Sequence, residues 1–122
     1  MAHRSVRRPL LCAAVTGRVA WAGLLLLAPG TLLRPVGPTS TVAVATLRVL
    51  GARHLAQAAV TVHRPTPGTL GAGAAVDGIH AFTALALAAV DRRQRRAALA
   101  DAAIAAAWAV LGTVAGRHEG EP

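Results

Sequence analysis

Four long apolar stretches dominate this sequence, and each has about the length of a membrane-crossing helix. They cover roughly residues 10–33, 42–62, 70–90 and 97–116. A helix rises about 1.5 Å per residue, so about 20 residues cross a hydrocarbon core of about 30 Å. No stretch alternates strictly between apolar and polar residues, which argues against strands. The pattern predicts an all-α protein, a transmembrane bundle of about four helices in a single domain over residues 1–122.

Turn and charge signals separate the stretches. Segment 34–41 contains Pro35, Gly37 and Pro38, which exclude a regular helix, and Ser40 or Thr41 is suited to be the N-cap of the next one. Two prolines and a glycine in segment 63–68 end the second stretch, and segment 91–96 is a charged turn with four arginines. These short connectors predict that successive helices run antiparallel.

The composition favours a bilayer over water as the surroundings of these helices. The chain is 54% hydrophobic and 15% charged, against about 25% charged in a typical soluble domain. A soluble Ala-rich bundle is the alternative, but its helices need broad polar faces that the first and fourth stretches lack. A cleaved signal peptide is an alternative for the first stretch, although Arg18 interrupts it and no clean Ala-x-Ala site follows. We expect a multi-pass protein of a bacterial cell membrane, with the lipid bilayer as its main partner.

The second stretch is too polar to insert alone. Its Leu and Val residues contribute about −2 to −4 kcal/mol on the insertion scale, and Arg48 and Arg53 oppose them with about +5 to +7 kcal/mol. Arg48 lies near the start of the stretch and can extend toward the interface. Arg53 lies near the midplane, so we expect it to meet an opposite charge from another helix.

Charged and titratable residues within the stretches provide such partners, and their depths can be compared. Arg53 lies about 15 Å into the second stretch, and Asp77 lies about 10 Å into the third from the opposite face. Their depths differ by about 5 Å in a bilayer of about 30 Å. Arg18 has a similar depth, and His80 shares a helix face with Asp77 at i+3. We predict a central cluster of Arg18, Arg53, Asp77 and His80.

The same reasoning on depth predicts a second, peripheral pair. Arg48 and Asp101 lie about 8 Å and about 6 Å into stretches that run in the same direction. Two further patterns suggest contact faces. One is a polar stripe on the second stretch, formed by Thr46, Arg53, Gln57 and Thr61. The other is small-xxx-small spacing on the third, from Gly71 to Ala75 and from Ala74 to Gly78. His54 is a further titratable residue of the second stretch.

The charge pattern is compatible with two functions. Nearly balanced charges favour ion pairs that hold the helices together, which predicts a structural or accessory protein. The alternative is a proton or ion pathway through Asp77 and His80, as in a small proton-coupled transporter or channel subunit. At 122 residues, a transporter of this size implies a homo-oligomer or a membrane partner protein.

Other functional classes lack their residue patterns. No Ser/His/Asp, Cys/His or HExxH constellation predicts an enzyme, and no His or Cys spacing predicts a metal site or another cofactor. The net charge of +8 comes from dispersed arginines, without the aromatic side chains that stack on nucleic-acid bases, so we expect no nucleic-acid partner. The lone Cys12 excludes an intrachain disulfide.

The segment Arg48-Val49-Leu50-Gly51-Ala52-Arg53-His54-Leu55, with the earlier Gly17-Arg18 and Pro29, resembles small bacterial four-helix membrane proteins of unknown function that carry a Gly-Ala-Arg motif. Segments 75–81 and 99–102 are also similar to that group. The resemblance covers about residues 15–112 and implies a four-helix membrane topology without an established activity. Many members have Asp at the position of His54.

Arginine counts leave the orientation of the bundle open. Cytoplasmic loops usually carry the excess of positive residues. With four crossings, one side holds Arg4, Arg7, Arg8, Arg64 and Arg117, and the other holds Arg34, Arg92, Arg93, Arg95 and Arg96. A re-entrant or peripheral segment is the alternative to four crossings.

Overall fold

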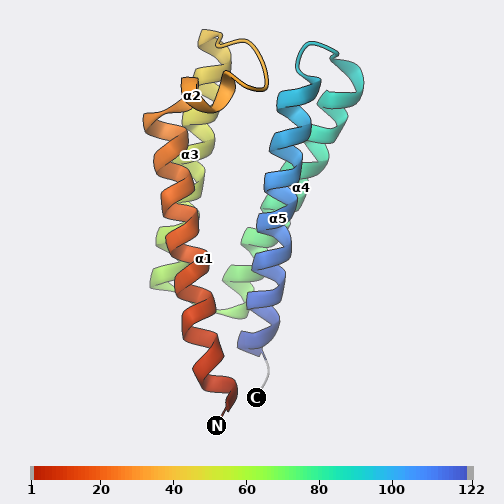
Figure 1. Ribbon diagram of the computed structural model, residues 1–122. Coiled ribbons are helices and arrows are strands. Elements are labelled where there is room, and N and C mark those ends of the chain that lie inside the picture. Colours follow the sequence, from red (N-terminus) through yellow and green to blue (C-terminus); the bar gives the residue numbers. More distant parts are fainter. Residues whose placement is uncertain (1, 121–122) are drawn as a thin grey trace.

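The computed structural model describes the backbone of residues 2–120 and the side chains of residues 8–117. Five helices make up this part of the chain: α1 (Ala2–Leu27), α2 (Pro29–Leu33), α3 (Thr41–His63), α4 (Pro67–Val90) and α5 (Arg95–Gly120). No strand occurs within it, so the all-α prediction is confirmed. The four long helices alternate in direction, and the start of α1 and the end of α5 lie at the same end of the molecule (Figure 1).

The first apolar stretch forms two helices, not the single one expected over residues 10–33. α1 begins far earlier, at Ala2, and ends at Leu27. Ala28 has φ −133° and ψ 44°, and Pro29 then starts the one-turn helix α2. Proline disfavours the helical conformation of the residue before it, which explains the break at Ala28. α2 therefore belongs to the connection that turns the chain into α3.

Side-chain caps fix the start of the next two long helices. The hydroxyl of Ser40 accepts a hydrogen bond from the backbone N–H of Ala43 at 3.1 Å and caps α3. The hydroxyl of Thr66 accepts one from Thr69 N–H at 3.1 Å and caps α4, whose first residue is a proline. Such caps satisfy backbone donors that the helix itself leaves unpaired.

The long helices pack as two antiparallel hairpins, α1 with α3 and α4 with α5 (Figure 1). In the first hairpin the closest approach is at Gly51 of α3. A Cβ atom at this position would lie 2.8 Å from Leu26 Cγ and 3.1 Å from the backbone oxygen of Ala22. The glycine of the Gly-Ala-Arg segment is thus required because the α1 backbone crosses directly over it.

The second hairpin has a seam of small residues. Buried positions on α4 are spaced alternately four and three apart, as in a coiled coil: Leu70, Ala74, Asp77, Ala81, Ala84 and Ala88. Among the described side chains of α5, the buried residues are all alanines: Ala98, Ala102, Ala105 and Ala115. A Cβ added to Gly112 of α5 would lie 3.2 Å from Ala74 Cβ. Small side chains therefore let α4 and α5 approach closely.

The contact face predicted from Gly71 and Ala75 was wrong. Both residues are exposed, and a Cβ at Gly71 or Gly78 would meet nothing within 4 Å. The glycines that matter for the second hairpin, Gly112 and Gly116, come from α5 and contact α4. Gly112 and Gly116 also have small-xxx-small spacing, but the contact face was predicted on α4 and not on α5.

Large apolar side chains cover the outside of the molecule. Among the most exposed are Leu27, Val42, Val49, Phe82 and Val90, each more than 70% exposed. Three helical segments are long and apolar enough to cross a membrane: Arg8–Leu27, Pro67–Val90 and Arg95–Arg117. α3 does not meet the same criterion, in keeping with the deficit expected from its two arginines. A core of small residues within an apolar exterior is the arrangement expected in lipid.

Candidate functional site

Asp77 occupies a core position of the α4 seam and is fully buried. Its carboxylate accepts hydrogen bonds from two guanidinium groups of the other hairpin. Arg18 Nη2 donates to Oδ2 at 2.8 Å, and Arg53 Nη2 donates to Oδ1 at 3.1 Å. The structure thus brings together Arg18, Arg53 and Asp77, three residues of the predicted central cluster. Both ion pairs join α4 to the α1–α3 hairpin.

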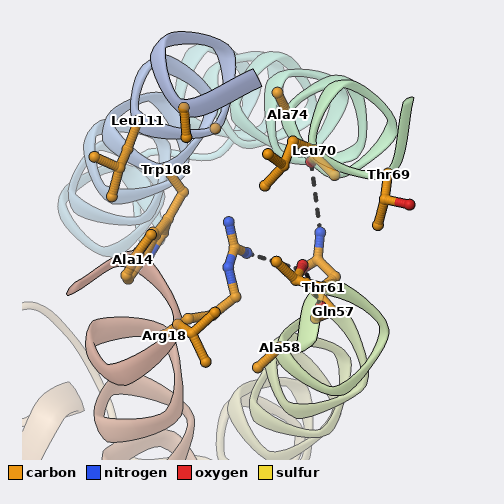
Figure 2. A pocket seen from close by; sticks show the side chains of 14 residues that line it. Ala14, Arg18, Gln57, Ala58, Thr61, Thr69, Leu70, Ala74, Trp108 and Leu111 are labelled. Carbon is orange, nitrogen blue, oxygen red and sulfur yellow. Dashed lines mark hydrogen bonds between the residues drawn. The ribbon is translucent and has the colours of Figure 1, made fainter. Parts of the chain in front are cut away.

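Arg18 also contacts the two remaining long helices. Its Nη1 donates to His54 Nδ1 at 2.9 Å and to Gln57 Oε1 at 3.0 Å, both on α3. Its Cζ lies 4.6 Å from the centre of the Trp108 ring on α5, a cation–π contact. In Figure 2 the guanidinium of Arg18 lies between the helices, with Trp108 on one side and Gln57 on the other. One side chain of α1 thus contacts α3, α4 and α5.

The protonation of His54 follows from its partner. An arginine has only donors, so the Nδ1 atom that Arg18 contacts must be the unprotonated ring nitrogen. His54 is 2% exposed, and its ring lies 5.9 Å from that of Trp108. It is therefore a neutral acceptor in the network and adds no charge to it. Arg18, Arg53 and Asp77 together carry two positive charges and one negative charge.

His80 does not join this cluster, contrary to the prediction. Its Nε2 lies 2.8 Å from Asp101 Oδ2 on α5. A step of three residues turns a side chain by about 60° around the helix axis. Asp77 therefore faces the first hairpin, while His80 faces α5. The expected partner of Asp101, Arg48, is exposed. It lies about 140° around α3 from Arg53, so equal depth does not bring Arg48 to Asp101.

Three contact residues were not assigned to the cluster from the sequence. His54 was recognised only as a titratable residue, Gln57 only as part of a stripe, and Trp108 was missed. Trp108 follows Asp101 by seven residues, two helical turns, which places it on the same face of α5. That spacing is the signal that would have found it. Of the predicted stripe, Thr61 lines the same cavity as Arg18 and Gln57, whereas Thr46 lies nearer to α2.

Two hollows adjoin the network. A cavity of about 30 Å³ touches Arg18, Gln57 and Trp108 between the four long helices (Figure 2), enough for about one or two water molecules. A groove of about 680 Å³ lies between α3 and α4 and is lined by Arg53 and Gln57. The surplus positive charge makes both hollows better suited to an anion than to a metal cation. Within the described side chains, no three His, Cys, Asp or Glu residues are grouped as metal ligands.

Comparisons with protein families, with curated proteins and with solved structures found no match for this chain. The resemblance based on the Gly-Ala-Arg segment therefore stays a prediction.

Proposed function

We propose that this chain is a multi-pass integral membrane protein with four crossing helices, α1, α3, α4 and α5. Its intramembrane Arg/Asp/His network holds two helical hairpins together, and its role is structural or accessory. The observation that carries the proposal is the position of Arg18, which contacts side chains of all three other long helices. Charged residues at membrane depth usually face the bundle interior and pair with one another.

Charge pairing also explains how α3 can lie within a membrane. Its arginines make it unfavourable as an isolated span. Arg53 has Asp77 as a counter-ion at 3.1 Å, and Arg48 near the helix start can extend toward the interface. In the first hairpin α3 lies beside α1, whose segment Arg8–Leu27 is long and apolar enough to cross a membrane.

Extraction experiments test the membrane part of the proposal. Membranes from cells that express the full chain are washed with high salt and with alkaline carbonate, with a known integral and a known peripheral protein followed as markers. The chain should stay with the integral marker and be released only by detergent. Release together with the peripheral marker would show that the helices do not cross the bilayer.

The role of the network is tested by two matched arginine variants. Arg18→Gln removes the guanidinium that contacts three helices, whereas Arg48→Gln removes an exposed one on α3. Thermal unfolding in detergent, followed by circular dichroism, should show a large loss of stability for the first and almost none for the second. Equal stability of the two variants would contradict a role of Arg18 in holding the hairpins together.

A second candidate function is proton transfer, now centred on His80 and Asp101. This pair favours it because Asp101 lines a groove of about 330 Å³ together with Ser40, Thr46 and Gln94, near the α2 end. Asp77 is less suited to this role, since both of its carboxylate oxygens already accept hydrogen bonds from guanidinium groups. Reconstituted liposomes should then show a pH-dependent flux that is lost in His80→Ala. Flux no higher than in empty liposomes would remove this candidate.

A further inference from the structure

Of the two arginines of the network, Arg53 is the more exposed on the outside of the bundle. Its side chain is 26% exposed and lines the groove of about 680 Å³ between α3 and α4. The groove walls are mainly apolar, with Ala56, Val60, Ala72 and Val76. Threonines 61, 66 and 69 lie toward the α3–α4 connection. The groove thus has the guanidinium of Arg53 at membrane depth, mainly apolar walls and a polar rim of threonines.

The other polar groups of the groove already have partners. Thr61 Oγ1 donates to the backbone oxygen of Gln57 at 2.8 Å. Thr66 Oγ1 accepts from Thr69 N–H, and the two hydroxyls lie 2.9 Å apart. Arg53 differs, because only its Nη2 has a partner, Asp77, and its buried Nε has no acceptor in the described part of the chain. Arg53 is therefore the group with unused hydrogen-bonding capacity.

The charges around Arg53 do not cancel. Asp77 is shared with Arg18, and His54 is neutral. The remaining intramembrane carboxylate, Asp101, lies against His80 on the opposite hairpin at 2.8 Å. A guanidinium that faces hydrocarbon is costly unless an anion or water solvates it. A bound anion removes the cost by neutralising the surplus charge.

We propose that the α3–α4 groove binds an organic monoanion with a short apolar body. Its carboxylate, or an equivalent acidic group, pairs with Arg53. Its apolar body lies along Val60, Ala72 and Val76. The volume lies within the range of about 300–1,000 Å³ that is typical of small-molecule sites. A water-soluble medium-chain acid and a membrane fatty acid share this chemistry, and the inference rests on the proposed membrane placement.

Binding is measured on the full chain in nanodiscs of zwitterionic lipid, with octanoate labelled with ¹³C at its carboxyl carbon as the probe. Line broadening of the carboxyl resonance, corrected for empty nanodiscs, should saturate with octanoate concentration. Arg53→Gln should weaken binding at least about tenfold, which corresponds to about 1.4 kcal/mol. That variant keeps the Arg18–Asp77 ion pair, and circular dichroism verifies its fold. Arg48→Gln removes an exposed arginine from the same helix and should bind as the wild type does.

Competing compounds separate the two parts of the proposed ligand. Acetate carries the charge without the body, and 1-octanol carries the body without the charge, so each should displace octanoate at least about tenfold less well than unlabelled octanoate. Displacement by oleate placed in the bilayer identifies a membrane source, and its failure to displace octanoate identifies a water-soluble one. The proposal is overturned if the signals equal those of empty nanodiscs, or if octanol competes as well as octanoate. Both outcomes hold whether or not Arg53→Gln folds. An error in the membrane placement shows separately, as release by carbonate.

Discussion

Replacing Asp77 by Asn removes one negative charge from the middle of the protein with little change in side-chain volume. The native carboxylate accepts hydrogen bonds from Arg18 at 2.8 Å and from Arg53 at 3.1 Å. An amide has a single acceptor oxygen, and its NH₂ group faces other donors. The variant therefore leaves two guanidinium groups close together with no counter-ion between them. We expect this to be the most destabilising conservative substitution in the chain.

The magnitude follows from burial and charge. Removing one partner of a buried ion pair costs about 3–5 kcal/mol, because the other charge remains buried and unpaired. Asp77 is fully buried, while the side chains of Arg18 and Arg53 are 12% and 26% exposed, which allows some rehydration. We therefore expect a loss of about 4 kcal/mol within that range. For a chain of this length, this lowers Tm by about 12–20 °C.

The assay is thermal unfolding of purified protein in detergent, followed by circular dichroism. Asp101→Asn is the matched control, since it also replaces an intramembrane Asp by Asn. The Asp101 side chain, which pairs with His80, is 31% exposed. We therefore expect a loss of stability of about 1 kcal/mol or less. A Tm for Asp77→Asn within about 2 °C of the wild type, a shift worth well under 1 kcal/mol, would refute the reasoning.

A double variant tests the cause of the loss. In Asp77→Asn combined with Arg53→Gln, only one guanidinium is left without a counter-ion. If unpaired charge causes the instability, the double variant should be more stable than Asp77→Asn alone. Residues in one ion-pair network are expected to deviate from additivity in this way. Additive losses from the two substitutions would mean that packing, not charge, determines the effect.

Substitutions at three further positions test the packing in the same unfolding assay. Gly51→Ala should cost about 1–3 kcal/mol because the new methyl group meets the α1 backbone. Its control is Gly78→Ala, whose methyl group meets nothing within 4 Å. Equal stability of the two variants would contradict the close crossing of α1 over α3. Gly112→Ala should cost less, about 1 kcal/mol, because its Cβ would meet another methyl group at 3.2 Å; a Tm above that of the wild type would show that this contact has room. Trp108→Phe should keep part of the contact with Arg18 and Trp108→Ala none, so stability should fall in that order; equal losses would exclude a contribution from the ring.

The sequence alone predicted the features that depend only on position along the helix axis. Helix formation, and the approximate bounds of α3 and α4, follow from the apolar stretches and their proline-rich connectors. The similar depth of Arg53 and Asp77 follows from the fixed rise per residue in antiparallel helices of nearly equal length. Ser40 as a helix cap follows from the chemistry of its hydroxyl alone. None of these inferences requires knowledge of which helices are neighbours.

The errors concern rotation about the helix axis. The i+3 spacing placed His80 with Asp77, and similar depth placed Arg48 with Asp101, but a contact also needs side chains that point toward each other. The direction depends on the pairing of helices into hairpins, which the connector lengths do not specify. A polar face on one helix indicates a contact, but it does not identify the neighbour. His80 meets α5 because α5 is the partner of α4 in the second hairpin.

Alanine-rich packing was unpredictable for a related reason. Small residues occur on nearly every face of α4 and α5, so small-xxx-small spacing can be found in several registers. Only Ala74 among the proposed α4 residues is buried, and it is buried because Gly112 leaves room for it on α5. The register is therefore a property of the pair of helices. A pattern read along one helix has too little information to select it.

In the proposed four-helix topology, the stability of the bundle and the membrane placement of α3 depend on the same contacts. α3 packs along α1, but α1 offers Arg53 no counter-ion, since the intramembrane charge of α1 is another arginine, Arg18. The carboxylate that neutralises Arg53 comes from α4, which follows α3 after a connector of only three residues. α3 is therefore expected to be stably placed only once α4 lies beside it. Because Asp77 also binds Arg18, the contact that compensates the charge of α3 is the one that joins the two hairpins.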